Sequence, residues 1–321
     1  MGRYIVRRLL YLVLVVLIIT LFTFFIFYVM PPGDAALAAA GKLPTPEILA
    51  EVREQFGLDD PLHIRYVNFV KGLFLGDEYG WPGLGVSFDT RSPVREEIFS
   101  RVGVTMQLAA GAAMIWLVIG VGIGVVSALN RRKLADRLAM GFALFGISAP
   151  VFAVGLAGLW LFAYQLDISP GTGFVPISES FSGWISHLWL PWLVLSLQYA
   201  AFYARMVRGN LLDTLGEDYI RTARAKGLSE RRVIGRHGLR SSLTPVVTLF
   251  GLDFSLLLGG AVLTETVFNL QGVGQLIVQS VNRSDLPVVV ATTVIAALFV
   301  TFMSLIVDIV YAYLDPRVRY A

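Results

Sequence analysis

The sequence predicts an all-α integral membrane protein with six transmembrane helices. Of its 321 residues, 56% are hydrophobic and only 15% are charged, and the apolar residues come in long blocks. A helix needs about 20 apolar residues to cross a bilayer, and it satisfies its backbone hydrogen bonds within the segment. Six blocks reach this length, at residues 9–30, 103–129, 138–166, 188–207, 243–264 and 286–314.

The positions of Lys and Arg predict that both termini are cytoplasmic. With the N-terminus inside, most of the 26 basic residues fall on the same side: Arg3, Arg7, Arg8, Arg131, Arg132, Lys133, Arg137, nine between Arg205 and Arg240, Arg317 and Arg319. Most of the others lie in the longest loop, where the positive-inside rule is weak. The first block also precedes Ala38, Ala39 and Ala40, as a signal peptide would, but its roughly 20 residues exceed a signal core of 7 to 15, so we expect a retained span.

This topology divides the chain into three parts. Residues 1–30 form the N-terminal tip and first span, residues 31–102 an extracytoplasmic loop that packs as a cap, and residues 103–321 the core with the other five spans. We expect two amphipathic helices in the outer loop, one ended by Gly57 and one after Pro61, followed by irregular chain from Gly72 to Gly85. Residues 208–242 form a basic cytoplasmic loop within the core.

Small residues and one proline mark features inside the spans. Gly120 and Gly124 have the spacing that lets two membrane helices approach backbone to backbone, and plain packing is the preferred interpretation. Pro150 is expected to kink the third span. The chain contains no cysteine, which excludes disulfides and thiolate metal sites, and its three histidines are too dispersed for a histidine metal site.

Asp253 is the carboxylate that lies deepest in an apolar block. An unpaired charge there costs at least about 2.5 kcal/mol, so its side chain should face protein, a partner or water. A lining residue of a substrate path and an inter-helix hydrogen bond explain it equally well. We take Asp253 as a candidate for the path, together with the polar Gln198 of the fourth span.

The 208–242 loop contains a short helix with clear end signals. Asp218 is a suitable N-cap, Tyr219 to Lys226 form two turns, and Gly227 can adopt the left-handed conformation that ends a helix. Ser229 then caps a second helix. The candidate segment comprises Asp218, Tyr219, Ile220, Arg221, Thr222, Ala223, Arg224, Ala225, Lys226, Gly227 and Leu228.

Two turns of helix are too short to be stable alone and need packing. Ala223 and Ala225 would let a partner approach closely, with Tyr219, Ile220 and Leu228 as apolar anchors, as for a helix seated in another protein's groove. A basic loop that contacts lipid headgroups explains the residues equally well.

A family resemblance decides between these interpretations. Residues 218–229 read Asp-Tyr-Ile-Arg-Thr-Ala-Arg-Ala-Lys-Gly-Leu-Ser, followed by His237-Gly238-Leu239-Arg240 and Thr244-Pro245. They resemble the EAA loop of ABC importer permeases of the dipeptide, oligopeptide and nickel family, in the first-permease, B-type branch. Arg221 and Thr222 depart from the general motif. Further similar segments are Arg7-Arg8-Leu9-Leu10, Gly57-Leu58-Asp59-Asp60-Pro61, Glu265-Thr266-Val267-Phe268, Gly272-Val273-Gly274 and Leu314-Asp315-Pro316-Arg317, whereas the outer loop around Glu78–Gly83 is longer than is usual in the family.

The resemblance implies a type I ABC importer permease fold in a bacterial or archaeal cytoplasmic membrane. It further implies a second homologous permease, two ABC ATPases that dock on residues 218–228, and an extracytoplasmic substrate-binding protein. The chain has no phosphate-binding Gly-x-x-x-x-Gly-Lys loop, so it is not expected to be an enzyme or to bind a cofactor; the partners would bind ATP and Mg. Peptides are the expected cargo, with nickel chelates, glutathione or oligosaccharides as alternatives. Membrane lipid is expected to surround the chain, and no nucleic-acid partner is expected.

The sequence does not favour a channel or an ion-coupled secondary transporter. A channel would need a selectivity element, and a secondary transporter would normally show several intramembrane ionisable groups and internal repeats. The sequence has neither pattern.

Overall fold

The computed structural model describes residues 2–29, 45–55, 57, 59–258 and 261–314. Ala38 to Ala40 and the motif that continues through Arg317 lie outside these residues. The described chain is helical, in this order: α1 (Gly2–Phe24), η1 (Phe25–Val29), α3 (Pro46–Gln55), α4 (Leu62–Leu75), α5 (Val94–Leu129), α6 (Leu134–Ser148), α7 (Val151–Gly158), η2 (Leu159–Gln165), α8 (Phe181–Gly216), α9 (Asp218–Ala225), α10 (Glu230–Arg232), η3 (Val233–Gly238), α11 (Leu239–Ser242), α12 (Thr244–Leu258), α13 (Val262–Phe268), α14 (Val273–Asn282) and α15 (Leu286–Leu314).

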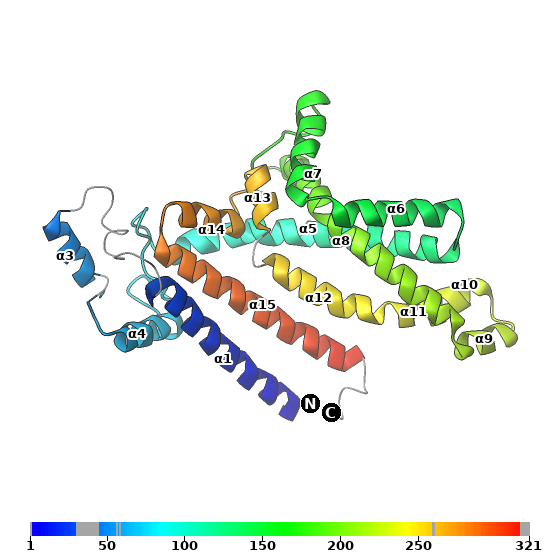
Figure 1. The fold of residues 1–321 in the computed structure, drawn as a ribbon, viewed down its shortest axis with the longest axis horizontal. Coiled ribbons are helices and arrows are strands. Elements are labelled where there is room, and N and C mark those ends of the chain that lie inside the picture. Colours follow the sequence, from blue (N-terminus) through cyan, green and yellow to red (C-terminus); the bar gives the residue numbers. More distant parts are fainter. Residues whose placement is uncertain (1, 30–44, 56, 58, 259–260, 315–321) are drawn as a thin grey trace.

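The helices form an elongated bundle. Helices α1, α12 and α15 run side by side, and α8 packs against both α5 and α6 (Figure 1). The outer-loop helices α3 and α4 lie at one end of the molecule, and α9, α10 and α11 lie at the other. Both expected outer-loop helices are therefore present. Gly57 has the left-handed φ of +56° that ends the first, and the second continues to Leu75, five residues beyond the predicted pattern.

Among the described residues, α5 and α15 are each long and apolar enough to cross a membrane, and two bent helix pairs add up to two more spans. The apolar part of α1 at Leu9–Phe24 is shorter, and α8 is a 36-residue helix with Pro191 inside. The predicted count of six spans therefore stays a prediction.

The predicted third span is broken rather than kinked. Helix α6 ends at Ser148, α7 starts at Val151, and the two halves differ in direction by 103°. Proline disfavours helical conformation in the residue before it, and Ala149 accordingly has an extended ψ of 124°. The change of direction expected at Pro150 is therefore present, but it is a break between two helices rather than a kink within one.

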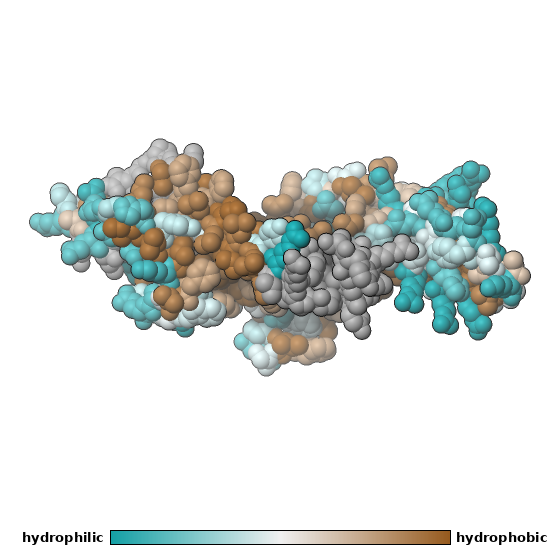
Figure 2. Space-filling view, turned by 90° about the horizontal axis from the view of Figure 1, so that it is seen from below, coloured by the Kyte–Doolittle hydropathy of each residue, from teal (hydrophilic) through white to brown (hydrophobic). Residues whose placement is uncertain are grey.

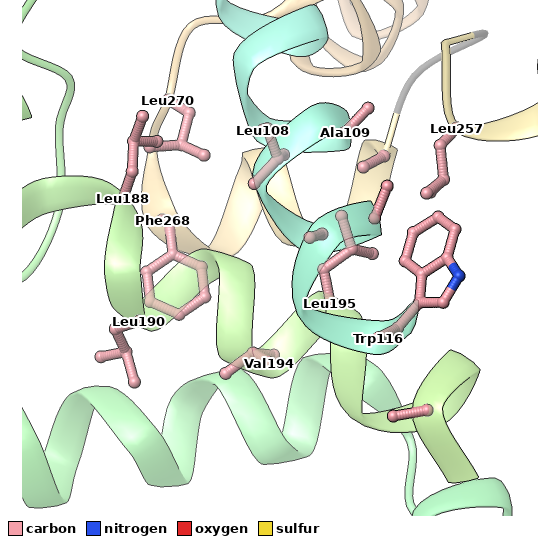
Figure 3. Close-up of a cluster of buried hydrophobic side chains, with 14 of the residues drawn as sticks. Leu108, Ala109, Trp116, Leu188, Leu190, Val194, Leu195, Leu257, Phe268 and Leu270 are labelled. Carbon is pink, nitrogen blue, oxygen red and sulfur yellow. The ribbon is translucent and has the colours of Figure 1, made fainter. Parts of the chain in front are cut away.

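The centre of the bundle is the contact between α5 and α8. Trp116 of α5 is fully buried and stacks on Tyr199 of α8 at 4.7 Å between ring centroids. Figure 3 shows Trp116 in the same cluster as Leu108, Val194 and Leu257, which come from three helices. Because lipid tails are as apolar as these side chains, close van der Waals packing rather than removal from water stabilises this contact in a membrane.

Glycines allow this approach. A Cβ built on Gly120 would lie 2.8 Å from Cβ of Tyr203, and one on Gly124 would lie 2.7 Å from the backbone oxygen of Ala204. The interpretation of these glycines as packing residues is confirmed within this chain.

The outer loop is fastened to the junction of α14 and α15. Asp285 is buried and accepts hydrogen bonds from Ser87 Oγ at 2.5 Å and from the Phe88 N–H at 3.0 Å. Arg283 adds an ion pair with Asp89 at 2.6 Å. These contacts hold residues 87–89 against the junction of α14 and α15. The assignment of residues 31–102 to an outer cap stays a prediction.

Gly124→Ala is expected to destabilise the protein by about 1 to 3 kcal/mol, because the added methyl overpacks against a backbone carbonyl that cannot move aside. Gly122→Ala is the matched control, since nothing lies within 4 Å of a Cβ at that position. Thermal unfolding of the purified variants in detergent measures the difference. Equal melting temperatures for the two variants would contradict the close approach of α5 and α8.

Candidate functional site: the short helix between α8 and α12

Helix α9 follows the end of α8 after a single residue. It comprises Asp218–Ala225, close to the expected two turns, and Glu217 rather than Asp218 is at the N-cap position. The predicted cap at Asp218 was wrong by one residue, because Asp218 is already helical. Its carboxylate instead accepts from Arg221 at 3.3 Å, and its backbone oxygen accepts from the Thr222 hydroxyl at 2.9 Å.

The helix ends as the sequence predicts. Gly227 has a φ of +78°, its N–H donates to Arg224 O at 2.9 Å, and the Leu228 N–H donates to Ala223 O at 3.3 Å. This pair of bonds is the Schellman motif, which satisfies carbonyls that a helix end leaves free. Ser229 is at the N-cap position of α10, although its side chain makes no capping bond.

One face of α9 is packed against its own chain. Ile220 and Val233 are fully buried and Ala223 is 7% exposed, and Leu215 and Leu228 pack around them. Ile220 and Ala223 are therefore not available to anchor a partner, which corrects the prediction for these two residues. The sequence could not separate the faces, because Val233 lies in η3, beyond α10.

The opposite face of α9 is open. Its exposed residues are Asp218, Tyr219, Arg221, Thr222, Arg224, Ala225, Lys226 and Gly227. Arg224 forms a two-pronged ion pair with Glu230 at 2.7 and 3.2 Å, which fixes α9 to α10. The Arg224 guanidinium lowers the pKa of the Glu230 carboxyl, so the pair is present at neutral pH and is lost as pH falls through that lowered pKa.

A basic hollow of about 430 Å³ lies beside this face and is lined by Tyr219, Arg236, His237, Arg240, Ser241 and Thr244. Figure 2 shows hydrophilic residues gathered at this end of the molecule. The end thus combines an exposed short helix with a surface of positive charge.

The two candidates for a substrate path lie on different helices, Asp253 on α12 and Gln198 on α8. Asp253 of α12 accepts a hydrogen bond from the Tyr203 hydroxyl of α8 at 2.7 Å and is partly buried. Gln198 is exposed on α8. The inter-helix hydrogen bond that the sequence offered as one explanation of Asp253 is present.

Sequence reasoning used Glu265 only as part of a family resemblance, yet it organises a buried network. Its carboxylate accepts from Thr105 Oγ1 at 2.8 Å and from the Gln275 N–H at 2.9 Å, in the first turn of α14. A Cβ on Gly272 would lie within 2.6 Å of both carboxylate oxygens. The spacing of Gly272 and Gly274 after Glu265 was the available signal.

No group of three potential metal ligands occurs within the residues that the structure describes.

Comparison with known proteins covers the whole chain. The family described as "Binding-protein-dependent transport system inner membrane component" matches residues 120–320, and "Binding-prot-dependent transport system membrane comp, N-term" matches residues 1–109. The probable peptide ABC transporter permease protein y4tP of Sinorhizobium fredii is 35% identical over 320 residues. The glutathione transport system permease protein GsiC is 40% identical in Salmonella typhimurium and 39% identical in Escherichia coli K12, over 321 residues; each match covers 100% of both chains.

Gly227→Ala is expected to destabilise the folded α9 and its turn at residue 227 by about 1 kcal/mol, since a left-handed φ is unfavourable for residues with a Cβ. Gly235→Ala is the control, because both positions have open space around a Cβ and only Gly227 has a positive φ. Hydrogen exchange of the α9 amides should then be about fivefold faster in Gly227→Ala alone. Equal exchange in both variants would show that the loop does not depend on this conformation.

Proposed function

Because this chain belongs to the family of binding-protein-dependent transport system inner membrane components, the permease subunits of ABC transporters, we propose that it forms half of the translocation path of an ATP-driven importer. A second, homologous permease supplies the other half. Two ABC ATPases bind and hydrolyse ATP with Mg, and an extracytoplasmic binding protein delivers the cargo. The permease itself is not the catalytic subunit of the system.

The observation that carries this proposal is that α9 has one buried and one exposed face. Ile220 and Ala223 pack against the rest of the chain, whereas Tyr219, Thr222 and Ala225 are exposed and open to a partner. A helix of eight residues is not stable alone. Because α9 is packed against its own chain, it can move as a rigid body with a docked ATPase and displace α8. We propose that residues 218–228 are this coupling segment.

The charge distribution supports a topology with this end in the cytoplasm. The turn between α5 and α6 carries Arg131, Arg132 and Lys133, and the basic hollow beside α9 carries Arg236 and Arg240. Cytoplasmic loops are enriched in such residues. We propose six spans, both termini in the cytoplasm, an outer cap at residues 31–102 and a core at residues 103–321 with the coupling loop at 208–242.

Peptides are the proposed cargo. The relatives that match over full length are named for peptide and for glutathione transport, and glutathione is itself a tripeptide, so a short peptide fits both. Among specific peptides, glutathione is the first candidate, because identity to GsiC is 40% and identity to y4tP is 35%. Nickel chelates and oligosaccharides are the remaining alternatives, and an ion-coupled secondary transporter is the competing class.

The coupling role predicts different results at two neighbouring alanines. Ala225→Glu alters only the exposed face, so ATP-driven uptake should fall about tenfold or more while the purified permease keeps its melting temperature. Ala223→Glu places a charge among Ile220 and Val233 and should lower the melting temperature as well. Uptake into reconstituted vesicles and thermal unfolding measure both effects. Normal uptake by a stable Ala225→Glu complex would refute docking on this face.

The path and the cargo predict a second result. We propose that Asp253 and Gln198 line the path; Asp253→Asn should lower ATP-driven uptake of a labelled tripeptide about tenfold, the value of one hydrogen bond to a charged group. Asp167→Asn, at an exposed turn after η2, is the matched control. Competition by unlabelled glutathione distinguishes the two cargo candidates. Uptake that proceeds without ATP, or is inhibited only by oligosaccharides, would contradict the peptide importer.

A further inference from the structure

A partly buried ion pair lies where α5, α6 and α8 meet. The Asp136 side chain is 6% exposed and pairs with Arg208, whose Nε lies 2.6 Å from Oδ1 and whose second nitrogen lies 2.9 Å from Oδ2. Ser127 Oγ donates to Oδ1 at 2.6 Å, and the Arg132 N–H donates to Oδ2 at 2.8 Å. One carboxylate thus holds four donors, each at good hydrogen-bonding distance.

The four donors come from three different elements. Ser127 is in the last turn of α5, Arg132 is in the turn that follows with a left-handed φ of +66°, and Arg208 is on α8. Asp136 itself is in the first turn of α6. The carboxylate therefore fixes the end of the α5–α6 hairpin to α8 at one point.

Arg208 is close to the proposed coupling segment along an unbroken helix. Helix α8 continues for eight residues beyond Arg208 to Gly216, and α9 begins at Asp218. Eight residues of helix span about 12 Å, a short and stiff connection. In the other direction, α6 leads to the break at Pro150 and then to α7 (Figure 1).

Resting on the function proposed above, we propose that Asp136 and Arg208 are positioning residues that join α8 rigidly to the α5–α6 hairpin, so that movement of α9 displaces α5, α6 and α8 together. Without the joint, α8 can shift against α6, and ATP hydrolysis proceeds without opening the path.

A purely stabilising role for the pair leads to a different result. If the pair only held the fold together, its loss would reduce the amount of assembled complex, and ATP hydrolysis and uptake would fall in proportion. If the pair joins α8 to the α5–α6 hairpin, its loss should lower the amount of cargo taken up per ATP hydrolysed. This ratio is independent of how much complex assembles.

The test uses the complete complex in vesicles, with its ATPases, its binding protein and a labelled tripeptide. Arg208→Gln and Asp136→Asn should each lower uptake per ATP about fivefold or more, the lower range of coupling between distant sites. Arg208→Lys keeps the charge but loses the planar fork, so its ratio should be intermediate, and it remains informative if the neutral variants fail to assemble. The double variant should be no worse than either single one, because both changes break one interaction.

Arg131→Gln is the matched control, since it removes a charge from the exposed side of the same turn and should keep the wild-type ratio. An unchanged ratio in assembled Arg208→Gln and Arg208→Lys would overturn the proposal. Failure of the proposed function would look different, because the wild-type complex would then show no ATP-driven uptake at all.

Discussion

Helices α5 and α8 approach each other closely because Gly120 and Gly124 leave no side chain between the two backbones. Several features described above lie on these two helices or at their ends. Tyr203, which donates to Asp253, packs directly over Gly120. The Asp136–Arg208 pair joins α6 to α8 at the basic end, where Ser127 of α5 also donates to Asp136, and α9 extends from the end of α8.

The basic end of the molecule combines rigidity with exposure. Ile220, Ala223 and Val233 form a small apolar cluster that fixes α9, while the hydrogen bonds of Gly227 and Leu228 define where it ends. Movement can be transmitted between distant sites only if the elements between them move as bodies. A short helix with one buried and one open face meets this requirement: in the proposed function, the open face binds the ATPase and the buried face passes its movement to the rest of the chain.

Sequence reasoning predicted the helical class, the outer-loop helices, the glycine contact and the end of α9 at Gly227, since these depend on local composition and on the conformational freedom of single residues. It could not predict which face of α9 is buried, because that depends on Val233 in η3, beyond α10. It also missed the pairing of Asp136 with Arg208, which are 72 residues apart. Pro150 was recognised, but the size of the bend depends on how α7 packs against α8 and α13.

The most direct test of the account is a cross-linking measurement at residue 225. The chain has no cysteine, so Ala225→Cys introduces a unique thiol on the open face of α9. With the complex purified from its own membrane, a short bifunctional reagent should link this thiol to an ATP-hydrolysing subunit, with a yield that changes when ATP is added. A chain that purifies without an ATPase, or a thiol at residue 225 that reacts freely and links to nothing, would contradict the account.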